Sequence, residues 1–154
     1  YPGYKDNMTD IQASLGIHQL KKLEKFFGQK EKIAGFYKKS FEGIPEIIPQ
    51  KVLKRMRHTW YLYPVLIDIN LLKIDRAEFI EALKAENIGT SVHFIPVHLH
   101  PYYKKTFGFK KGDFPNAEYV YERVVSLPIH STMTLEDAKD VVDGVKKIID
   151  YYKK

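Results

Sequence analysis

The stretch from Gly89 to Tyr103 holds the densest group of chemically capable side chains in this chain of 154 residues. It reads GTSVHFIPVHLHPYY, with three histidines, two prolines and three aromatic residues, and without Asp, Glu, Lys or Arg. A histidine can bind a metal, transfer a proton or hydrogen-bond a ligand. The stretch is therefore a candidate metal site, catalytic loop, ligand-binding wall or piece of packed β-structure.

The residues around the histidines argue against a metal site. His98 and His100 are two residues apart, so on a strand both rings would face one side, and His93 lies five residues before His98. Three histidines can bind zinc. Here, however, Pro96 and Pro101 interrupt regular geometry, and no acidic residue of the stretch can orient an imidazole. We expect no metal.

Other catalytic patterns are missing from the sequence. The chain has no cysteine, which excludes disulfides and thiolate chemistry. It has no G-x-S-x-G elbow, no P-loop and no G-x-G-x-x-G fingerprint. The sequence therefore offers no complete catalytic constellation of its own.

The basic charge of the chain raises the question of a nucleic-acid partner. The formal net charge is +6, and the pairs Lys104-Lys105 and Lys110-Lys111 flank Phe107 and Phe109. Cations beside aromatic rings suit phosphate contacts and base stacking. Lysines spread along the whole chain are more typical of solvated helix faces, so we expect no nucleic acid.

A ligand-binding wall is the remaining chemical interpretation. His93, His98, Tyr102 and Tyr103 place hydrogen-bonding groups on aromatic bodies, and prolines fix the backbone around them. Core histidines satisfied by the backbone would give the same pattern. The residues alone support these two interpretations equally.

Composition predicts a globular protein without a membrane partner. Apolar residues make up 44% and charged residues 29% of the chain, and no apolar run approaches the ~18 residues of a membrane span. The N-terminus lacks the pattern of a signal peptide. Together with the absence of cysteine, this predicts a cytoplasmic protein. Because the chain starts at Tyr1 within an expected loop, we also expect that it is part of a longer protein.

The periodicity of apolar residues predicts alternating helices and strands. A long helix should start at the capping box Thr9–Gln12 and end near Phe41, weakened at Gly28, while residues 44–57 should be irregular. The other predicted helices are Asp75–Asn87, Pro115–Val124 and one from Thr134 onward, and the predicted strands are His58–Ile69, Thr90–Ile95 and Val125–Ile129. Few strands, two of them next to or containing proline, favour an α+β (mixed α/β) fold with a small mixed or antiparallel sheet and helices packed on one face.

Four segments give the chain a family resemblance. They read GYKDNMTDIQASLGIHQLKKL, HTWYLYPVLID, NIGTSVHFIPVHLHPYY and GDFPNAEYVYERVVSLPIHSTMT, and together they cover nearly all of residues 3–134. In this order and spacing they resemble the DegT-type (DegT/DnrJ/StrS) sugar aminotransferases, which use pyridoxal 5′-phosphate (PLP).

The resemblance implies the C-terminal small domain of a fold type I PLP enzyme. Residues 1–43 would form an interface loop and a long linking helix, and residues 44–154 the small α+β domain. The lysine that forms the Schiff base would lie upstream of the segment matching Gly3–Met8, in a missing N-terminal domain. None of this chain's lysines would then be catalytic, and the isolated fragment would be inactive.

The resemblance also implies roles for particular residues. The segment containing Tyr4, Lys5 and Asn7 would reach across a homodimer interface to the neighbouring subunit's PLP phosphate, although Asp6 replaces the family's usual second aromatic residue there. The segment from His93 to Tyr103 would line the substrate entrance. The implied substrate contacts are His93, His98, Tyr102, Tyr103, His58 and Trp60.

The implied reaction is transfer of an amino group, with glutamate as the donor, to a nucleotide-linked keto-sugar in cell-surface polysaccharide or amino-sugar biosynthesis. PLP would supply the electron sink. A PLP-dependent sugar dehydratase of the same family, in which histidine replaces the catalytic lysine, is an alternative. A regulatory or binding module that kept the fold without catalysis is another.

Overall fold

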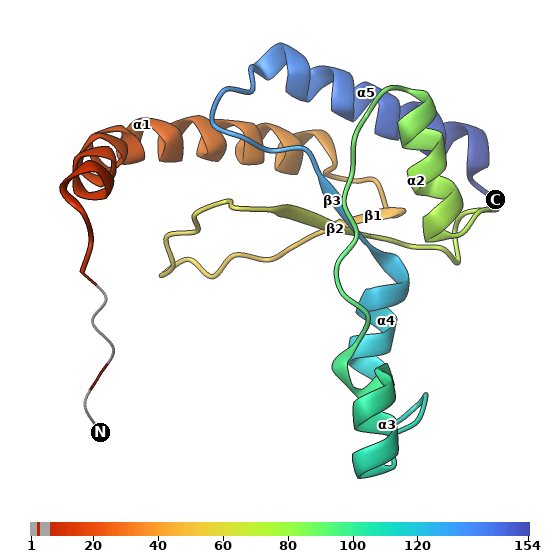
Figure 1. The fold of residues 1–154 in the computed structure, drawn as a ribbon. Helices are drawn as coiled ribbons and strands as arrows, with labels where there is room; N and C mark the ends of the chain where they lie inside the picture. Colours follow the sequence, from red (N-terminus) through yellow and green to blue (C-terminus); the bar gives the residue numbers. More distant parts are fainter. Residues whose placement is uncertain (1–2, 4–6) are drawn as a thin grey trace.

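The computed structural model describes residue 3 and residues 7–154. In chain order the elements are α1 (Asp10–Ser40), β1 (Ile47–Pro49), β2 (Tyr63–Ile67), α2 (Arg76–Ala85), the 3₁₀ helix η1 (Val97–Leu99), α3 (Pro101–Phe107), α4 (Pro115–Arg123), β3 (Val124–Leu127) and α5 (Leu135–Tyr152). Figure 1 shows α1 and α5 together on one side of the strands, while α3 and α4 project from the other side.

The three strands form an antiparallel sheet in the order β1-β2-β3. Along β2, Tyr63, Val65 and Ile67 are buried and the residues between them are half-buried, because side chains of a strand point alternately to its two faces. The buried face lies against the helices. This confirms the predicted small antiparallel sheet with helices packed on one face.

The core is built where α1, α5 and the sheet meet. The inner face of α5 consists of buried residues that recur at helical spacing, namely Ala138, Val141, Val142, Val145, Ile148 and Ile149, with Tyr152 at its half-buried end. From α1 the core takes Ile33, Ala34 and Tyr37, followed by Phe41. Burial raises the pKa of Tyr63 to about 12, as expected for a phenol removed from water.

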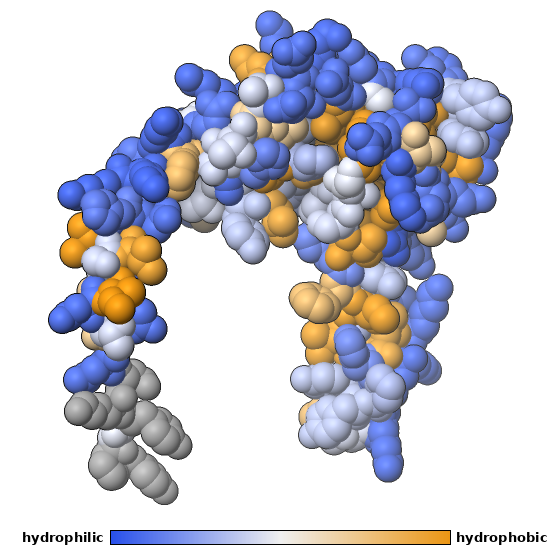
Figure 2. Space-filling model, turned by 45° about the horizontal axis from the view of Figure 1, so that its top comes forward, coloured by the Kyte–Doolittle hydropathy of each residue, from blue (hydrophilic) through white to orange (hydrophobic). Residues whose placement is uncertain are grey.

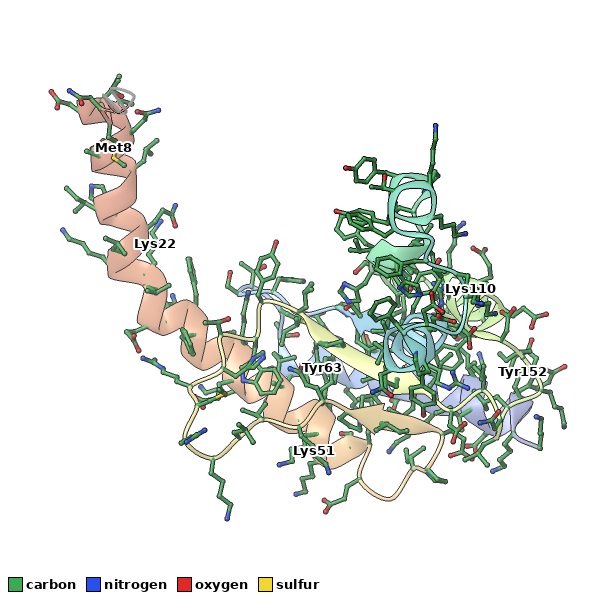
Figure 3. The ribbon with its side chains drawn as sticks, turned by 90° about the horizontal axis from the view of Figure 1, so that it is seen from below. Met8, Lys22, Lys51, Tyr63, Lys110 and Tyr152 are labelled. Atoms are coloured by element: carbon green, nitrogen blue, oxygen red, sulfur yellow. The ribbon has the colours of Figure 1, made fainter. Side chains whose placement is uncertain are left out.

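Helix α1 has two halves with different surroundings. It is one continuous helix of 31 residues, as predicted. Its C-terminal half is buried in the core, but its N-terminal half exposes the apolar residues Ile11, Leu15, Leu20 and Leu23. Figure 3 shows Lys22 on a part of the helix that extends away from Tyr63 and the rest of the chain, with Met8 just before the helix start.

The helix starts follow the capping pattern of the sequence. Thr9 and Gln12 form a capping box at α1, Asp75 and Glu78 form one at α2, and Thr134 with Asp137 form one at α5. Each box satisfies two backbone N–H groups that a helix start otherwise leaves unpaired. The end of α2 is also as predicted, since Asn87 adopts the left-handed conformation with a φ of 60°.

Three predicted elements differ in the structure. Residues 90–95 form no strand and make only one bridge, Ser91 to Ser126, at the edge of β3. The strand predicted from His58 begins only at Tyr63, and Ile47–Pro49 forms a strand within the segment predicted to be irregular. Backbone pairing decides these boundaries, with β2 for Ile47–Pro49, with β1 and β3 for Tyr63–Ile67 and with β3 for residues 90–95, since a strand exists only where a partner backbone lies alongside it.

The buried side of α4 does not follow its apolar residues. Ala117 and Val120 are exposed, whereas Glu118 and Arg123 are buried. Helix α4 lies in the part of the chain that projects from the sheet, so its apolar side does not face the core. Its buried Glu118 contacts His98 and the backbone N–H of Gly112 instead.

Within the described residues, no helix combines the length and the apolar character that a membrane span requires. The long helices α1 and α5 both carry many charged side chains along their outer faces. Most apolar residues of α5 are buried in the core, and those in the first half of α1 form only a stripe.

The packing predicts opposite effects of alanine at two helical glycines. A Cβ at Gly35 would meet no atom, whereas a Cβ at Gly144 would collide with Cδ1 of the buried Ile88. Gly35→Ala should therefore raise the free energy of unfolding by up to about 1 kcal/mol, since alanine favours the helix. Gly144→Ala should give a value about 1–3 kcal/mol below that of Gly35→Ala, because Ile88 must shift. Urea denaturation followed by circular dichroism measures both, and equal gains would contradict the packing at Gly144.

Candidate functional site

The segment that carries His98, Tyr102 and Tyr103 forms a projecting arm. We use "arm" for residues 97–123, which contain η1, α3 and α4. In Figure 2 the arm and the N-terminal half of α1 point the same way and flank an open hollow, and both carry apolar surface. The structure thus places Tyr102 and Tyr103 on α3, away from the sheet.

A buried hydrogen bond between a histidine and a carboxylate lies inside the arm. His98 is buried, and its Nε2 lies 2.8 Å from Oε1 of Glu118, which is buried as well. The same Oε1 accepts a hydrogen bond of 2.8 Å from the backbone N–H of Gly112. One carboxylate oxygen therefore joins η1, the loop before α4 and α4 itself.

The electrostatics of Glu118 follow from these contacts. The N–H of Gly112, and next the imidazole of His98, lower the pKa of the Glu118 carboxyl below its ordinary value, because both stabilise the ionised form. Glu118 lies near the start of α4, where the helix dipole also favours negative charge. The imidazole of His98 is therefore buried and bound to Glu118, and this placement favours a structural role for the ring.

A continuous series of aromatic contacts runs along the arm. Adjacent ring centroids are 4.7 to 6.0 Å apart, in the order His98, Phe114, Phe109, Phe107, Tyr103, Tyr102. The inner end of the series is the buried imidazole. At the outer end Tyr102 is 66% exposed and Tyr103 is 37% exposed, so these phenols can reach a ligand.

His93 lies at the edge of the sheet and not in the arm. Its Nε2 is 2.8 Å from Oγ of Ser126, a buried residue of β3. Next to it, Ser91 and Ser126 exchange backbone hydrogen bonds of 3.3 and 3.0 Å. His93 therefore fixes the chain that leads into the arm.

His58 and Trp60 form a separate group before β2. The backbone N–H of Trp60 donates to Nδ1 of His58 over 2.9 Å, and the centroids of the two rings lie 4.4 Å apart. Trp60 has a φ of 49°, a strained conformation for a bulky residue. Such strain persists only where the surroundings enforce it, here through His58 and through stacking on Tyr63 at 5.6 Å.

Trp60 and Tyr63 also line an open groove of about 910 Å³ beside the end of α1. Its walls include Phe41 and Ile47, and Lys51 and Lys54 lie on the segment that follows β1. The loop continuing from these lysines runs along α1, since Arg57 forms an ion pair with Glu24 and stacks on Phe27. The groove and the arm share no lining residue.

The residues predicted to reach a PLP phosphate are mostly beyond structural description. Tyr4 and Lys5 lie outside the described residues, and Asn7 is exposed just before α1. None of the lysines among residues 7–154 is buried. A Schiff-base lysine needs an enclosed pocket, so the described residues do not by themselves fit PLP, and no chemical step can be assigned to them.

Metal chemistry finds no support in the arm either. In the described part of the chain, no three His, Cys, Asp or Glu side chains gather closely enough to hold a metal ion. His100, the third histidine of the opening stretch, is instead 3.1 Å from the Ile95 carbonyl oxygen.

Sequence reasoning missed Glu118. The opening stretch contains no acidic residue that could orient an imidazole, and the carboxylate that does so comes from 20 residues further along the chain. The only local signal was an acid in the first turns of a helix that begins at Pro115. Such a residue is usually explained by the helix dipole alone.

The fold and the arm agree with a known family. The sequence profile of the DegT/DnrJ/EryC1/StrS aminotransferase family matches residues 1–146. The chain belongs to this family, whose aminotransferases depend on PLP, and the resemblance predicted from the four segments is confirmed.

Three curated relatives show how much of such a protein the chain represents. A Methanocaldococcus jannaschii protein is 61% identical over 96% of this chain and 38% of its own length. The spore coat polysaccharide biosynthesis protein SpsC of Bacillus subtilis is 50% identical over 96% of this chain and 38% of its own length. The UDP-4-amino-4,6-dideoxy-N-acetyl-beta-L-altrosamine transaminase of Campylobacter jejuni is 36% identical over 99% and 40%. The chain thus spans about two fifths of these relatives.

Solved structures give the same proportion. PseC of Helicobacter pylori, an aminotransferase of pseudoaminic acid biosynthesis, matches 97% of this chain with a TM-score of 0.84 and 26% identity, over 39% of its own chain. The PLP form of Spr1654 from Streptococcus pneumoniae matches 98% with a TM-score of 0.83 and 27% identity, over 38% of its own chain. The predicted fold, that of one part of a fold type I PLP enzyme, is confirmed.

The Glu118 contacts predict a pH-dependent contribution to stability. Because the folded-state pKa of Glu118 is lowered, its contribution is present above the unfolded-state pKa and is lost as the pH falls through the folded-state value. Glu118→Gln should therefore be less stable than the wild type at pH 7, and the difference should shrink in acid. Urea denaturation at pH 7, 5 and 3 measures this, with the exposed Glu122→Gln of the same helix as control. A pH-independent difference would contradict the assignment.

Proposed function

We propose that this chain is the C-terminal part of a PLP-dependent aminotransferase that transfers an amino group from glutamate to a nucleotide-linked keto-sugar. The product would enter cell-surface polysaccharide or amino-sugar biosynthesis in the cytoplasm. The observation that carries the proposal is the family match over residues 1–146, together with relatives of which the chain spans about two fifths.

The exposed apolar half of α1 supports the view that the chain works within a larger protein. Ile11 is 75% and Leu20 is 69% exposed, although both lie on one helix with well-buried residues. Exposed apolar stripes of this kind are usual at interfaces. We therefore assign residues 1–43 to an interface loop and linking helix and residues 44–154 to a small domain, with the PLP-binding lysine supplied by an N-terminal domain.

We assign substrate contacts to the outer end of the arm. Tyr102 and Tyr103 offer exposed phenols on aromatic rings, which suits hydroxyl groups and a sugar or base face. His98 and His93 would support this wall from behind, through Glu118 and Ser126. His58 and Trp60 would contribute at the mouth of the site.

A homodimer would complete each site. Tyr4, Lys5 and Asn7 precede α1, whose first half carries the exposed apolar stripe. A cation and an amide donor suit a phosphate dianion. We propose that these three residues reach the neighbouring subunit's PLP phosphate.

The full-length protein provides the direct test of the function. With PLP bound, it should show an absorption band near the visible edge that bleaches with glutamate, and it should then aminate a UDP-linked keto-sugar. Residues 1–154 alone should do neither, because no lysine among residues 7–154 is buried. A stable chromophore without amino transfer would favour the dehydratase, and the absence of any chromophore would favour a binding module. Turnover by residues 1–154 would overturn the proposal.

Subunit mixing tests the dimer. A Lys5→Ala, Asn7→Ala double variant and a variant lacking the Schiff-base lysine should each be nearly inactive in the full-length protein. In a mixed dimer one of the two sites has both its own lysine and an intact neighbour segment, so mixing should restore up to about half of the activity of one wild-type dimer per heterodimer. No recovery, with both variants folded and subunit exchange confirmed by mass spectrometry, would count against the shared site.

A further inference from the structure

Helix α3 stands in the structure without any buried residue of its own. All of its side chains from Pro101 to Phe107 are exposed, so burial in a core does not fix its position. The 3₁₀ helix η1, which precedes α3, does have a buried residue, since His98 is only 6% exposed. The position of α3 therefore depends on contacts at its two ends.

At the N-terminal end the contact is the Glu118 carboxylate. His98 lies three residues before α3, and its Nε2 is 2.8 Å from Oε1 of Glu118. The ring is also held against Phe114 at a centroid distance of 4.7 Å. Since Tyr102 follows His98 by only four residues, a shift of the imidazole would move the tyrosine with it.

The loop that follows the C-terminal end of α3 contacts the same carboxylate of Glu118. The chain leaves α3 through Gly108 and turns back at Gly112, whose φ values of 72° and 99° lie in the region that favours glycine. This turn presents the Gly112 N–H to Oε1 of Glu118 at 2.8 Å. A single oxygen atom thus holds both ends of the excursion that contains α3.

We propose that Glu118 is a positioning residue that fixes α3 so that Tyr102 and Tyr103 face the sugar-nucleotide substrate. This inference rests on the proposed function. Glu118 does not touch the substrate; it acts by accepting two N–H donors, one from each side of α3. Its substitution should therefore weaken binding of the sugar and leave the cofactor and the amino donor largely unaffected.

The two donors define a graded series of variants. In Glu118→Gln the amide oxygen can occupy the place of Oε1 and still accept from both donors, although the charge is lost. In Glu118→Asp the charge remains, but the side chain is one methylene shorter and cannot reach both donors. In Glu118→Ala both donors lose their acceptor, which in a buried site is more costly than the loss of an exposed hydrogen bond.

The experiment measures steady-state kinetics of the full-length protein with glutamate and a panel of UDP-linked keto-sugars. Glu118→Ala and Glu118→Asp should raise the apparent KM for the sugar about 10-fold, and Glu118→Gln about 3-fold or less. The KM for glutamate and the PLP absorption spectrum should stay as in the wild type. Tyr102→Phe, which removes a direct contact, should raise the sugar KM without a change in melting temperature.

Glu122→Gln is the matched control, because Glu122 lies one turn further along α4 and is exposed; its sugar KM should equal that of the wild type. Should Glu118→Ala fail to fold, Glu118→Asp carries the same comparison. Glu118→Asp and Glu118→Ala variants with a wild-type sugar KM would overturn the positioning role alone. A wild-type protein that aminates none of the UDP-linked sugars would overturn the proposed function, and the inference with it.

Discussion

Tyr37 of α1 makes the contact on which the folded part of the chain depends. Its ring lies 4.9 Å from that of Tyr63 on β2, and its hydroxyl donates to the Pro128 carbonyl just after β3 over 2.8 Å. Burial raises its pKa, as expected for a phenol whose charged form would be unpaired. One fully buried side chain thus joins the long helix, the central strand and the connection to α5.

Two parts of the chain do not pack against this core. They are the first half of α1 and the arm, which flank the same hollow in Figure 2. Both expose apolar side chains, among them Leu15 at 61% and Phe107 at 58%. Exposed apolar surface of this kind is usual at interfaces, which agrees with the proposed place of the chain in a larger protein.

Within the arm, polar contacts take the place of a core. A buried carboxylate without partners would be strongly unfavourable, and Glu118 escapes this by accepting from Gly112 and His98. From the buried His98, successive packed aromatic rings extend to Tyr102 and restrict the motion of α3. This arrangement suits a ligand wall, since it holds exposed side chains in place without burying them.

The sequence by itself determined the elements whose pattern is local. The capping boxes at Thr9, Asp75 and Thr134, the apolar face of α5 and the continuous α1 could all be predicted, because they depend on residues within one or two helical turns. The four family segments likewise identified the family, and the α+β fold followed from the order of the elements.

Tertiary structure alone decided the polar contacts between segments that are distant in the sequence. His98 looked like an open ligand contact, but its ring is buried against a carboxylate 20 residues away. Segment 90–95 has the composition of a strand, yet it lies at an edge where only Ser91 forms a β-bridge. The inner face of α4 could not be predicted for the same reason. The spacing of apolar residues shows which side of a helix packs on an apolar core, and α4 buries Glu118 and Arg123 instead. Contacts of this kind depend on how distant segments meet, which no local pattern records.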